Sequence, residues 1–399
     1  MKTIKGAVTA PKGFKAAGVR CGLKQSGNDF AMIVSDVTAS AAGLFTNNVF
    51  CAAPVTLDRE KLKDGKASVI IANSGNANAS TGAVGMKNAE DSCALAAKLL
   101  GKDESEVLCA STGVIGHLLD TDKLFAGIKV ASMSLSEEGG TSAAKAIMTT
   151  DTVAKHAAAE FEIGGVKTRM GIICKGSGMI CPNVATMLCF ITTDAEVAPD
   201  TLKGALIDAC ERSFNSLSVD GDGSTNDTVI ILANGLSGCG EIKPGTPEYT
   251  VFSDALTALC VKMAKAMAAD GEGATKYIEI RVKNAATYGD AKLAAKTIAN
   301  SALVKTAVFG EDPNWGRVLA AAGRSGAKME AEKTSLWFGD VKIFEKGEPL
   351  PLDPDTARAP MLEKELVITV DFGIGSENAT AFTCDFSYDY VKINAEYHT

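Results

Sequence analysis

Apolar positions along the chain fall into short continuous runs and longer stretches with a helical repeat, and the two kinds alternate throughout. Short runs bounded by Gly, Asn or Asp predict buried strands. The clearest of these runs cover residues 66–73, 186–193, 228–233, 277–282 and 366–372. Two further runs between residues 157 and 173 flank Gly164-Gly165, and this arrangement predicts a β-hairpin.

Apolar residues at three- and four-residue spacing predict helices between these strands. The predicted helices cover residues 88–100, 202–214 and 255–267. Gly101 is expected to close the first of them. A short predicted strand at 106–110 runs into Ser111-Thr112-Gly113, and a helix is expected after Gly116. The pattern as a whole indicates a protein of mixed α and β structure with many short strands.

Length, charge and cysteine content limit the classes of protein to which the chain can belong. The chain has 399 residues and a formal net charge of −8. Nucleic acids and anionic membranes bind basic surfaces, so we expect neither as a partner. No apolar run approaches the roughly 20 residues that span a bilayer, and the N-terminus lacks the apolar core of a secretory signal. The eleven cysteines are scattered and odd in number, which is typical of reduced thiols in a cytoplasmic protein.

Histidine is scarce, and its scarcity limits the catalytic chemistry. The three histidines are His117, His156 and His398, and none has a metal-binding spacing. The chain has no P-loop or dinucleotide-binding motif. The run DGDGSTND at 220–227 resembles a calcium-binding loop, but it lacks the glycine at the sixth loop position and the glutamate that closes such a loop. We therefore interpret it as a turn. We expect no metal and no cofactor, and a catalytic base that is not histidine.

The segment KGSGMICPNVATML, residues 175–188, offers such a base. A threonine hydroxyl is a weak nucleophile and needs a base to activate it. Cutting the bond between Ala185 and Thr186 would free an α-amine beside that hydroxyl, with a pKa of about 7.7–8.0 in model compounds. The residues alone leave two interpretations open: Thr186 is a nucleophile released by self-cleavage, or it is an ordinary first residue of a strand.

A family resemblance favours the first interpretation. KGSGMICPNVATML closely resembles the self-cleaving segment of the ornithine acetyltransferase family, the glutamate N-acetyltransferases of arginine biosynthesis. Other segments resemble the family in the same order along nearly the whole chain: APKGFKAAGVRCGLK, SGNANASTG, ASTGVIG, AIMTTDT, SFNSLSVDGDGSTNDT, DGEGATK, FGEDPNWGR and YVKINAEYHT. Val184 departs from the family pattern, in which Met is common, but it carries no chemistry.

The resemblance implies a fold and a covalent mechanism. It implies an α+β protein with mixed sheets and two lobes, cut into an α chain of residues 1–185 and a β chain of residues 186–399 that share one core. Thr186 would take the acetyl group of N2-acetylornithine as an ester, release ornithine, and pass the acetyl group to glutamate. Thr112 and Gly113 would form the oxyanion hole.

The resemblance also implies substrate contacts from both chains. Lys175 would bind a substrate carboxylate, and Glu272 an ammonium group. Thr149 would supply a hydroxyl contact, with the adjacent Thr150 as an alternative. Asn394 and Thr399 would close the site from the C-terminus.

The family further implies an α2β2 heterotetramer of the cleaved chains. Some members also accept acetyl-CoA, and no motif in the sequence decides whether this chain does. Two other functions stay open at this point. A threonine amidase or aminopeptidase would pass the acyl group to water and yield acetate. A catalytically inactive binding protein of the same fold would remain uncut and would not be acylated.

Overall fold

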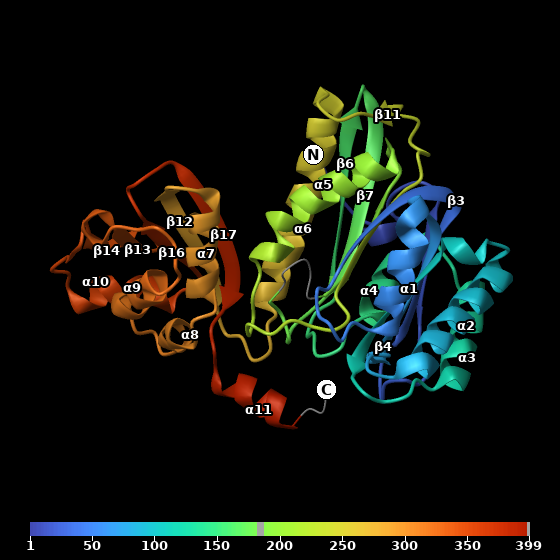
Figure 1. Ribbon diagram of the computed structural model, residues 1–399, viewed down its shortest axis with the longest axis horizontal. Helices are drawn as coiled ribbons and strands as arrows, with labels where there is room; N and C mark the ends of the chain where they lie inside the picture. The colour runs from blue at the N-terminus through green and yellow to red at the C-terminus, as the bar shows by residue number, and fades with distance from the viewer. Residues whose placement is uncertain (182–186, 397–399) are drawn as a thin grey trace.

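The computed structural model describes residues 1–181 and 187–396, which form two lobes built on separate β-sheets (Figure 1). Within these residues the larger sheet has nine strands, in the order β1-β6-β7-β8-β10-β3-β4-β5, with β2 paired to β3. Its strands are β1 (Lys2–Ile4), β2 (Phe14–Val19), β3 (Phe30–Phe45), β4 (Lys66–Asn76), β5 (Val107–Val114), β6 (Lys155–Ile163), β7 (Val166–Lys175), β8 (Leu188–Thr193) and β10 (Thr228–Ala233). The expected α+β class with two lobes is confirmed.

Helices cover both faces of the large sheet. The helices of this lobe are α1 (Ala53–Lys61), α2 (Gly82–Leu100), α3 (Thr121–Met133), α4 (Gly140–Ala146), α5 (Pro199–Glu211) and α6 (Pro247–Ala269). On one face, α5 and α6 pack over β6, β7, β8 and β10, while α2 and α3 pack over β3, β4 and β5. On the opposite face, α4 and the short 3-10 turn at Ala7–Thr9 cover the middle strands. The short strands β9 (Glu196–Val197) and β11 (Glu241–Ile242) pair beside this lobe.

The smaller lobe carries a sheet with six strands in the described residues, in the order β15-β14-β13-β16-β12-β17. Its strands are β12 (Tyr277–Ala285), β13 (Ser335–Phe338), β14 (Val341–Glu345), β15 (Glu348–Pro349), β16 (Glu365–Asp371) and β17 (Glu377–Cys384). The remaining helices are α7 (Tyr288–Ala299), α8 (Ala302–Phe309), α9 (Trp315–Gly323), α10 (Pro354–Arg358) and α11 (Tyr388–Glu396). Side chains of α7, α8 and α9 form one core with one face of this sheet.

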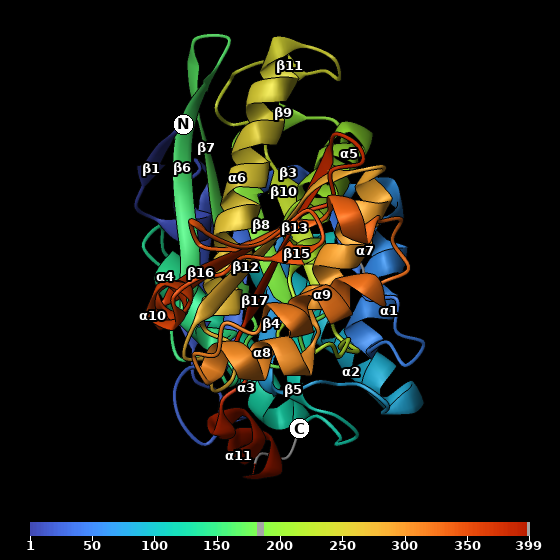
Figure 2. The same ribbon diagram turned by 90° about the vertical axis from the view of Figure 1, so that its left-hand side faces the viewer.

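Helix α6 joins the two lobes. Tyr277, Phe382 and Cys384 of the smaller sheet share a hydrophobic core with α6 and with strands of the large sheet. Figures 1 and 2 both place α6 where the smaller lobe meets the larger one. This core draws residues from both sides of the expected cut, as the family resemblance implied.

The predicted strands and the hairpin are confirmed where the structure describes them, while several element boundaries differ. Helices α2 and α6 begin at Gly82 and Pro247, earlier than predicted. Strand β5 does not stop at Ala110 but continues through Thr112 and Gly113, because these residues pair in parallel with Ser74–Asn76 of β4. The helix expected after Gly116 begins only at Thr121. Helix α5 ends at Glu211, and Phe214 lies in a separate 3-10 turn.

The described residues contain no helix that combines the length and the apolar character needed to cross a membrane. None of the eleven cysteines, all of which lie in the described residues, forms a disulfide, and seven of them are buried.

The close crossing of β7 over the N-terminal 3-10 turn gives a test of this packing. A Cβ atom on Gly171 would lie 1.8 Å from the carbonyl oxygen of Ala7. A backbone carbonyl cannot move out of the way by a rotamer change, as a side chain can. We therefore expect Gly171→Ala to lower the free energy of unfolding by about 3 kcal/mol. Urea denaturation measures the change.

Gly204→Ala is the matched control. Gly204 lies in α5, and a Cβ there would meet no atom within 4 Å. Alanine favours helix over glycine, so this variant should be as stable as the wild type or up to about 1 kcal/mol more stable. Equal stability of Gly171→Ala and wild type would contradict the described crossing.

Candidate active site

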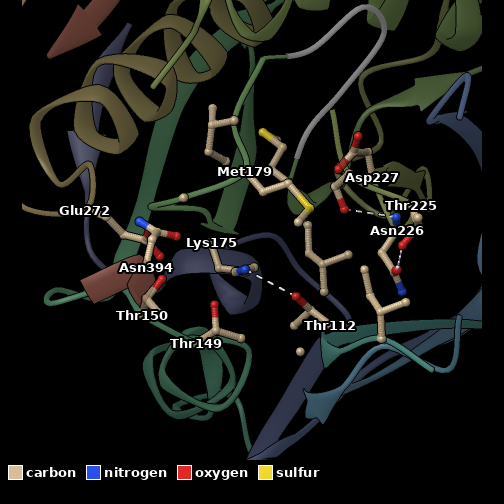
Figure 3. Close-up of a pocket in the computed structure, with 17 residues that line it drawn as sticks. Thr112, Thr149, Thr150, Lys175, Met179, Thr225, Asn226, Asp227, Glu272 and Asn394 are labelled. Carbon is tan, nitrogen blue, oxygen red and sulfur yellow. Dashed lines mark hydrogen bonds between the residues drawn. The ribbon is translucent and has the colours of Figure 1, made fainter. Parts of the chain in front are cut away.

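One pocket collects residues from both lobes and from distant parts of the sequence (Figure 3). It opens where β5 and β7 end and where β8 and β10 begin. Among the described residues, its lining comprises Thr112, Gly113, Ile115, Thr149, Thr150, Lys175, Gly178, Met179, Ile180, Met187, Leu188, Ser224, Thr225, Asn226, Asp227, Glu272 and Asn394.

The expected site residues that the structure describes all lie in this pocket. Thr112, Gly113, Lys175, Glu272 and Asn394 line it. Both candidates of the threonine doublet, at 149 and 150, line it as well, so the geometry does not choose between them. The expected residues at 185, 186 and 399 (Ala185, Thr186 and Thr399) lie outside the described residues.

Sheet register brings residues that flank the expected cleavage site to the pocket wall. Leu188, the first residue of β8, lies between Lys175 of β7 and Thr228 of β10. Ile180 and Met187, which lie on either side of the expected cut along the chain, both line the pocket. The chain therefore approaches and leaves this segment along the same cavity.

Lys175 is the buried cation of the pocket. Its Nζ donates a hydrogen bond to Oγ1 of Thr112 at 3.2 Å (Figure 3). An ammonium group has no acceptor, so the hydroxyl oxygen of Thr112 must accept, and its own hydrogen can point elsewhere. Burial lowers the pKa of Lys175, while Asp151, Asp227 and Glu272 partly offset that effect.

The turn that carries Thr112 and Gly113 depends on a close approach between two strands. Gly113 has φ 132°, in the region that favours glycine. A Cβ atom on Gly113 would lie 2.4 Å from the carbonyl carbon of Gly75, so any side chain would push β5 away from β4. The segment SGNANASTG thus shapes the site through its backbone. Directly before it, Oδ1 of Asn73 accepts a hydrogen bond from the hydroxyl of Ser111 at 2.6 Å.

At another part of the wall, a carboxylate and an amide face each other. Glu272 is 7 % exposed, and its Oε2 accepts a hydrogen bond from Nδ2 of Asn394 at 2.8 Å. Asn394 belongs to α11, which lies apart from the rest of the smaller lobe in Figure 1. Gly178 makes room for Glu272, because a Cβ on Gly178 would lie 2.3 Å from the Glu272 carboxylate.

The DGDGSTND segment, interpreted above as a simple turn, forms one wall of the pocket. Asn226 is buried, and its Nδ2 donates to the carbonyl oxygens of Ala77 at 2.6 Å and Ser111 at 2.7 Å. It thereby holds β5 beside β10. Asp227 is also buried, and burial raises the pKa of its carboxyl well above the usual value. The only sequence signal for these roles is a polar run directly before a buried strand.

The described residues contain no group of three or more His, Cys, Asp or Glu side chains arranged to hold a metal ion. The pocket instead offers a buried ammonium group, a hydroxyl that can donate, and a carboxylate. Groups of this kind bind and polarise small charged molecules, so the fold and the site define an enzyme that acts on small-molecule substrates.

The chain belongs to the ArgJ family, which matches residues 15–399. It is 52% identical to the arginine biosynthesis bifunctional protein ArgJ of Symbiobacterium thermophilum, over 100% of both chains. It is 48% identical to the protein of the same name from Caldanaerobacter subterraneus subsp. tengcongensis, again over 100% of both. The crystal structure of the arginine biosynthesis bifunctional protein ArgJ from Bacillus halodurans matches with 41% identity and a TM-score of 0.51. That match covers 52% of this chain and 98% of the solved chain.

The anchoring of β5 by Asn226 can be tested by stability. Asn226→Ala would leave two buried carbonyl oxygens without their donors, and we expect the free energy of unfolding to fall by about 2–4 kcal/mol. Asn378→Ala is the control: Asn378 is exposed and donates to the Ser376 carbonyl at 3.0 Å, where water can replace it. Urea denaturation of both variants gives the comparison, and equal stabilities would contradict the anchoring role.

Proposed function

We propose that this enzyme moves the acetyl group of N2-acetylornithine to glutamate through an acetyl ester on Thr186, after cutting its own chain between Ala185 and Thr186. The observation that carries the proposal is the composition of the pocket. Thr112, Gly113 and Lys175 come from before the proposed cut, and Glu272 and Asn394 come from after it. Ile180 and Met187, which lie on either side of the proposed cut along the chain, line the same pocket.

The half-length match to the Bacillus halodurans structure supports the cut. Nearly the whole of that solved chain matches only about half of this one, as expected if a relative exists as two polypeptides. The pieces of a cut chain would stay together, because β7 before the cut pairs with β8 after it, from Lys175 opposite Leu188 to Met170 opposite Thr193.

The first half-reaction would release ornithine. The α-amine of Thr186 takes the hydroxyl proton as Oγ attacks the acetyl carbonyl of N2-acetylornithine. The carbonyl oxygen becomes an oxyanion, which the Thr112 hydroxyl and the backbone at Gly113 stabilise by hydrogen bonding. The carbon–nitrogen bond then breaks, the ammonium of Thr186 returns its proton to the leaving amine, and the acetyl group remains as an ester.

The second half-reaction would form the product. The neutral amine of glutamate attacks the ester carbonyl, and the same donors stabilise the second oxyanion. The ester bond breaks, the Thr186 hydroxyl regains a proton from the attacking amine, and N-acetylglutamate leaves. We propose that Lys175 binds the substrate carboxylate, that Glu272 and Asn394 bind the ammonium end of ornithine, and that Thr149 or Thr150 and the terminal Thr399 complete the contacts.

Two properties of the assembled enzyme are part of the proposal. We propose an α2β2 heterotetramer of the cut chains, as the family resemblance implies. We also propose a cytoplasmic location, because scattered cysteines without disulfides, seven of them buried, are typical of a reducing compartment. The relatives are named arginine biosynthesis proteins. This name favours transfer of the acetyl group to an amine over its transfer to water, which is the amidase alternative.

Thr186→Ala tests the cleavage and the transfer together. Without the hydroxyl we expect one uncut chain on a denaturing gel and no N-acetylglutamate from N2-acetylornithine and glutamate. Thr186→Ser keeps a hydroxyl and should still be cut. Thr250→Ala, at an exposed threonine of α6, should be cut and fully active. Cleavage of Thr186→Ala, or accumulation of acetate in place of N-acetylglutamate in the wild type, would overturn the proposal.

We further propose acetyl-CoA as a second acetyl donor, and the word bifunctional in the relatives' name supports it. The test compares two mixtures, each with glutamate: one holds acetyl-CoA and the other holds N2-acetylornithine. We expect N-acetylglutamate in both, with free CoA released in the first. Product in the second mixture alone would limit the enzyme to recycling acetyl groups from acetylornithine.

A further inference from the structure

A buried cluster of charges lies directly beneath the pocket. Nζ of Lys155 lies 2.7 Å from Oδ1 of Asp151 and 2.5 Å from Oδ2 of Asp270. The side chains are almost inaccessible, with exposures of 1 % for Lys155, 0 % for Asp151 and 8 % for Asp270. Burying three charged groups is costly unless each is fully paired, so the arrangement must be well satisfied to persist.

Asp151 uses its remaining acceptor capacity on the backbone of the pocket. Its Oδ1 accepts the N–H of Gly176 at 2.8 Å, and its Oδ2 accepts the N–H of Thr149 at 3.1 Å. Gly176 directly follows Lys175. One carboxylate therefore fixes the chain at Thr149 and immediately after the buried ammonium.

Asp270 extends the same network to the carboxylate of the pocket. Its side chain accepts the backbone N–H of Thr152 at 3.1 Å, and its carbonyl oxygen accepts the hydroxyl of Ser177 at 2.6 Å. The carbonyl of Ser177 in turn accepts the N–H of Glu272 at 2.9 Å. A continuous set of bonds thus joins the backbone beside Lys175 to the backbone of Glu272.

We propose that Asp151, clamped by Lys155 and linked to Asp270, positions the Lys175 ammonium relative to the Glu272 carboxylate, and so sets which charged substrates the pocket accepts. This inference rests on the proposed function, in which these two groups bind opposite charges of the substrate. Asp151, Lys155 and Asp270 are positioning residues, because they act through their neighbours and do not line the pocket.

Among the charged groups around Lys175, Asp151 has the largest favourable effect on the protonated form of this lysine. The anionic groups that face Lys175 are Asp151, Asp227 and Glu272, and Asp151 exerts the largest effect of the three. Lys155 opposes them, and Lys24 also faces both Lys175 and Asp151. If Asp151 became neutral, Lys155 would lose a directly paired carboxylate, and Lys175 would lose the strongest of the charges that favour its protonated form.

Asp151→Asn is the central variant, because it keeps the shape of the side chain and removes the charge. We expect the KM for N2-acetylornithine to rise about tenfold or more, with a smaller change in kcat. Activity that needs charged Lys175 is lost as pH rises through the pKa of this lysine. Because removing the Asp151 charge lowers that pKa further, the alkaline limb of the kcat/KM profile should move to lower pH.

A triple variant separates positioning from simple stabilisation. Asp151→Asn combined with Lys155→Met and Asp270→Asn removes the charges of all three members of the cluster, so no unpaired charge remains among them. We expect its melting temperature to recover toward the wild type while KM and the alkaline limb stay displaced. Asp36→Asn is the matched control, because Asp36 pairs with Lys15 at 3.2 Å on the surface. Removing this exposed pair should change neither the KM nor the alkaline limb.

The outcomes are distinct. A raised KM and a displaced alkaline limb in both Asp151 variants support the inference. Wild-type KM and pH profile in Asp151→Asn would overturn it, and so would recovery of both properties in the triple variant, which would show a purely structural cluster. Absence of acetyl transfer in the wild type would instead overturn the proposed function.

Discussion

The burial of one ammonium group governs the rest of the pocket. Lys175 ends a central strand, where water cannot solvate its charge. A buried cation without partners would lose its proton or destabilise the fold. The structure meets this constraint with three carboxyl groups and one hydroxyl, drawn from four separate segments of the chain: Asp151, Asp227, Glu272 and Thr112. Asp227, Glu272 and Thr112 also line the pocket, whereas Asp151 lies outside its lining.

The position of the pocket follows from sheet topology. Strands β7 and β8 are antiparallel neighbours and β8 and β10 are parallel, so the end of β7 and the starts of β8 and β10 meet at one edge of the large sheet. The end of β5 reaches the same edge through Asn226, which bonds to the carbonyl of Ser111. Ile180 and Met187, on either side of the proposed cut, both line the pocket at this edge, and the pairing of β7 with β8 would hold the two pieces of a cut chain together.

Local sequence was enough to predict part of the secondary structure, including β4, β8, β10, β12, α5 and α6, because apolar runs and helical spacing indicate burial. The long strand β3 and most helices of the smaller lobe were not predicted. The family resemblance pointed to Thr112, Gly113, Lys175, Glu272 and Asn394, all of which the structure brings into one pocket. Other features were not predictable from local pattern. Strand β5 continues through a Ser-Thr-Gly sequence, typical of turns, only because β4 pairs with it at Gly75, a contact between distant segments. The roles of Asn226, Asp227 and Asp151 likewise depend on long-range contacts, which leave no periodic signal in the sequence.

The account depends most on a covalent acetyl group held by Thr186. The direct measurement is the intact mass of the enzyme after incubation with N2-acetylornithine in the absence of glutamate, followed by peptide mapping. The account predicts that the chain of residues 186–399 gains the mass of one acetyl group, that this group maps to Thr186, and that added glutamate removes it. An unmodified enzyme that still forms N-acetylglutamate, or an acetyl group on another residue, would contradict the account.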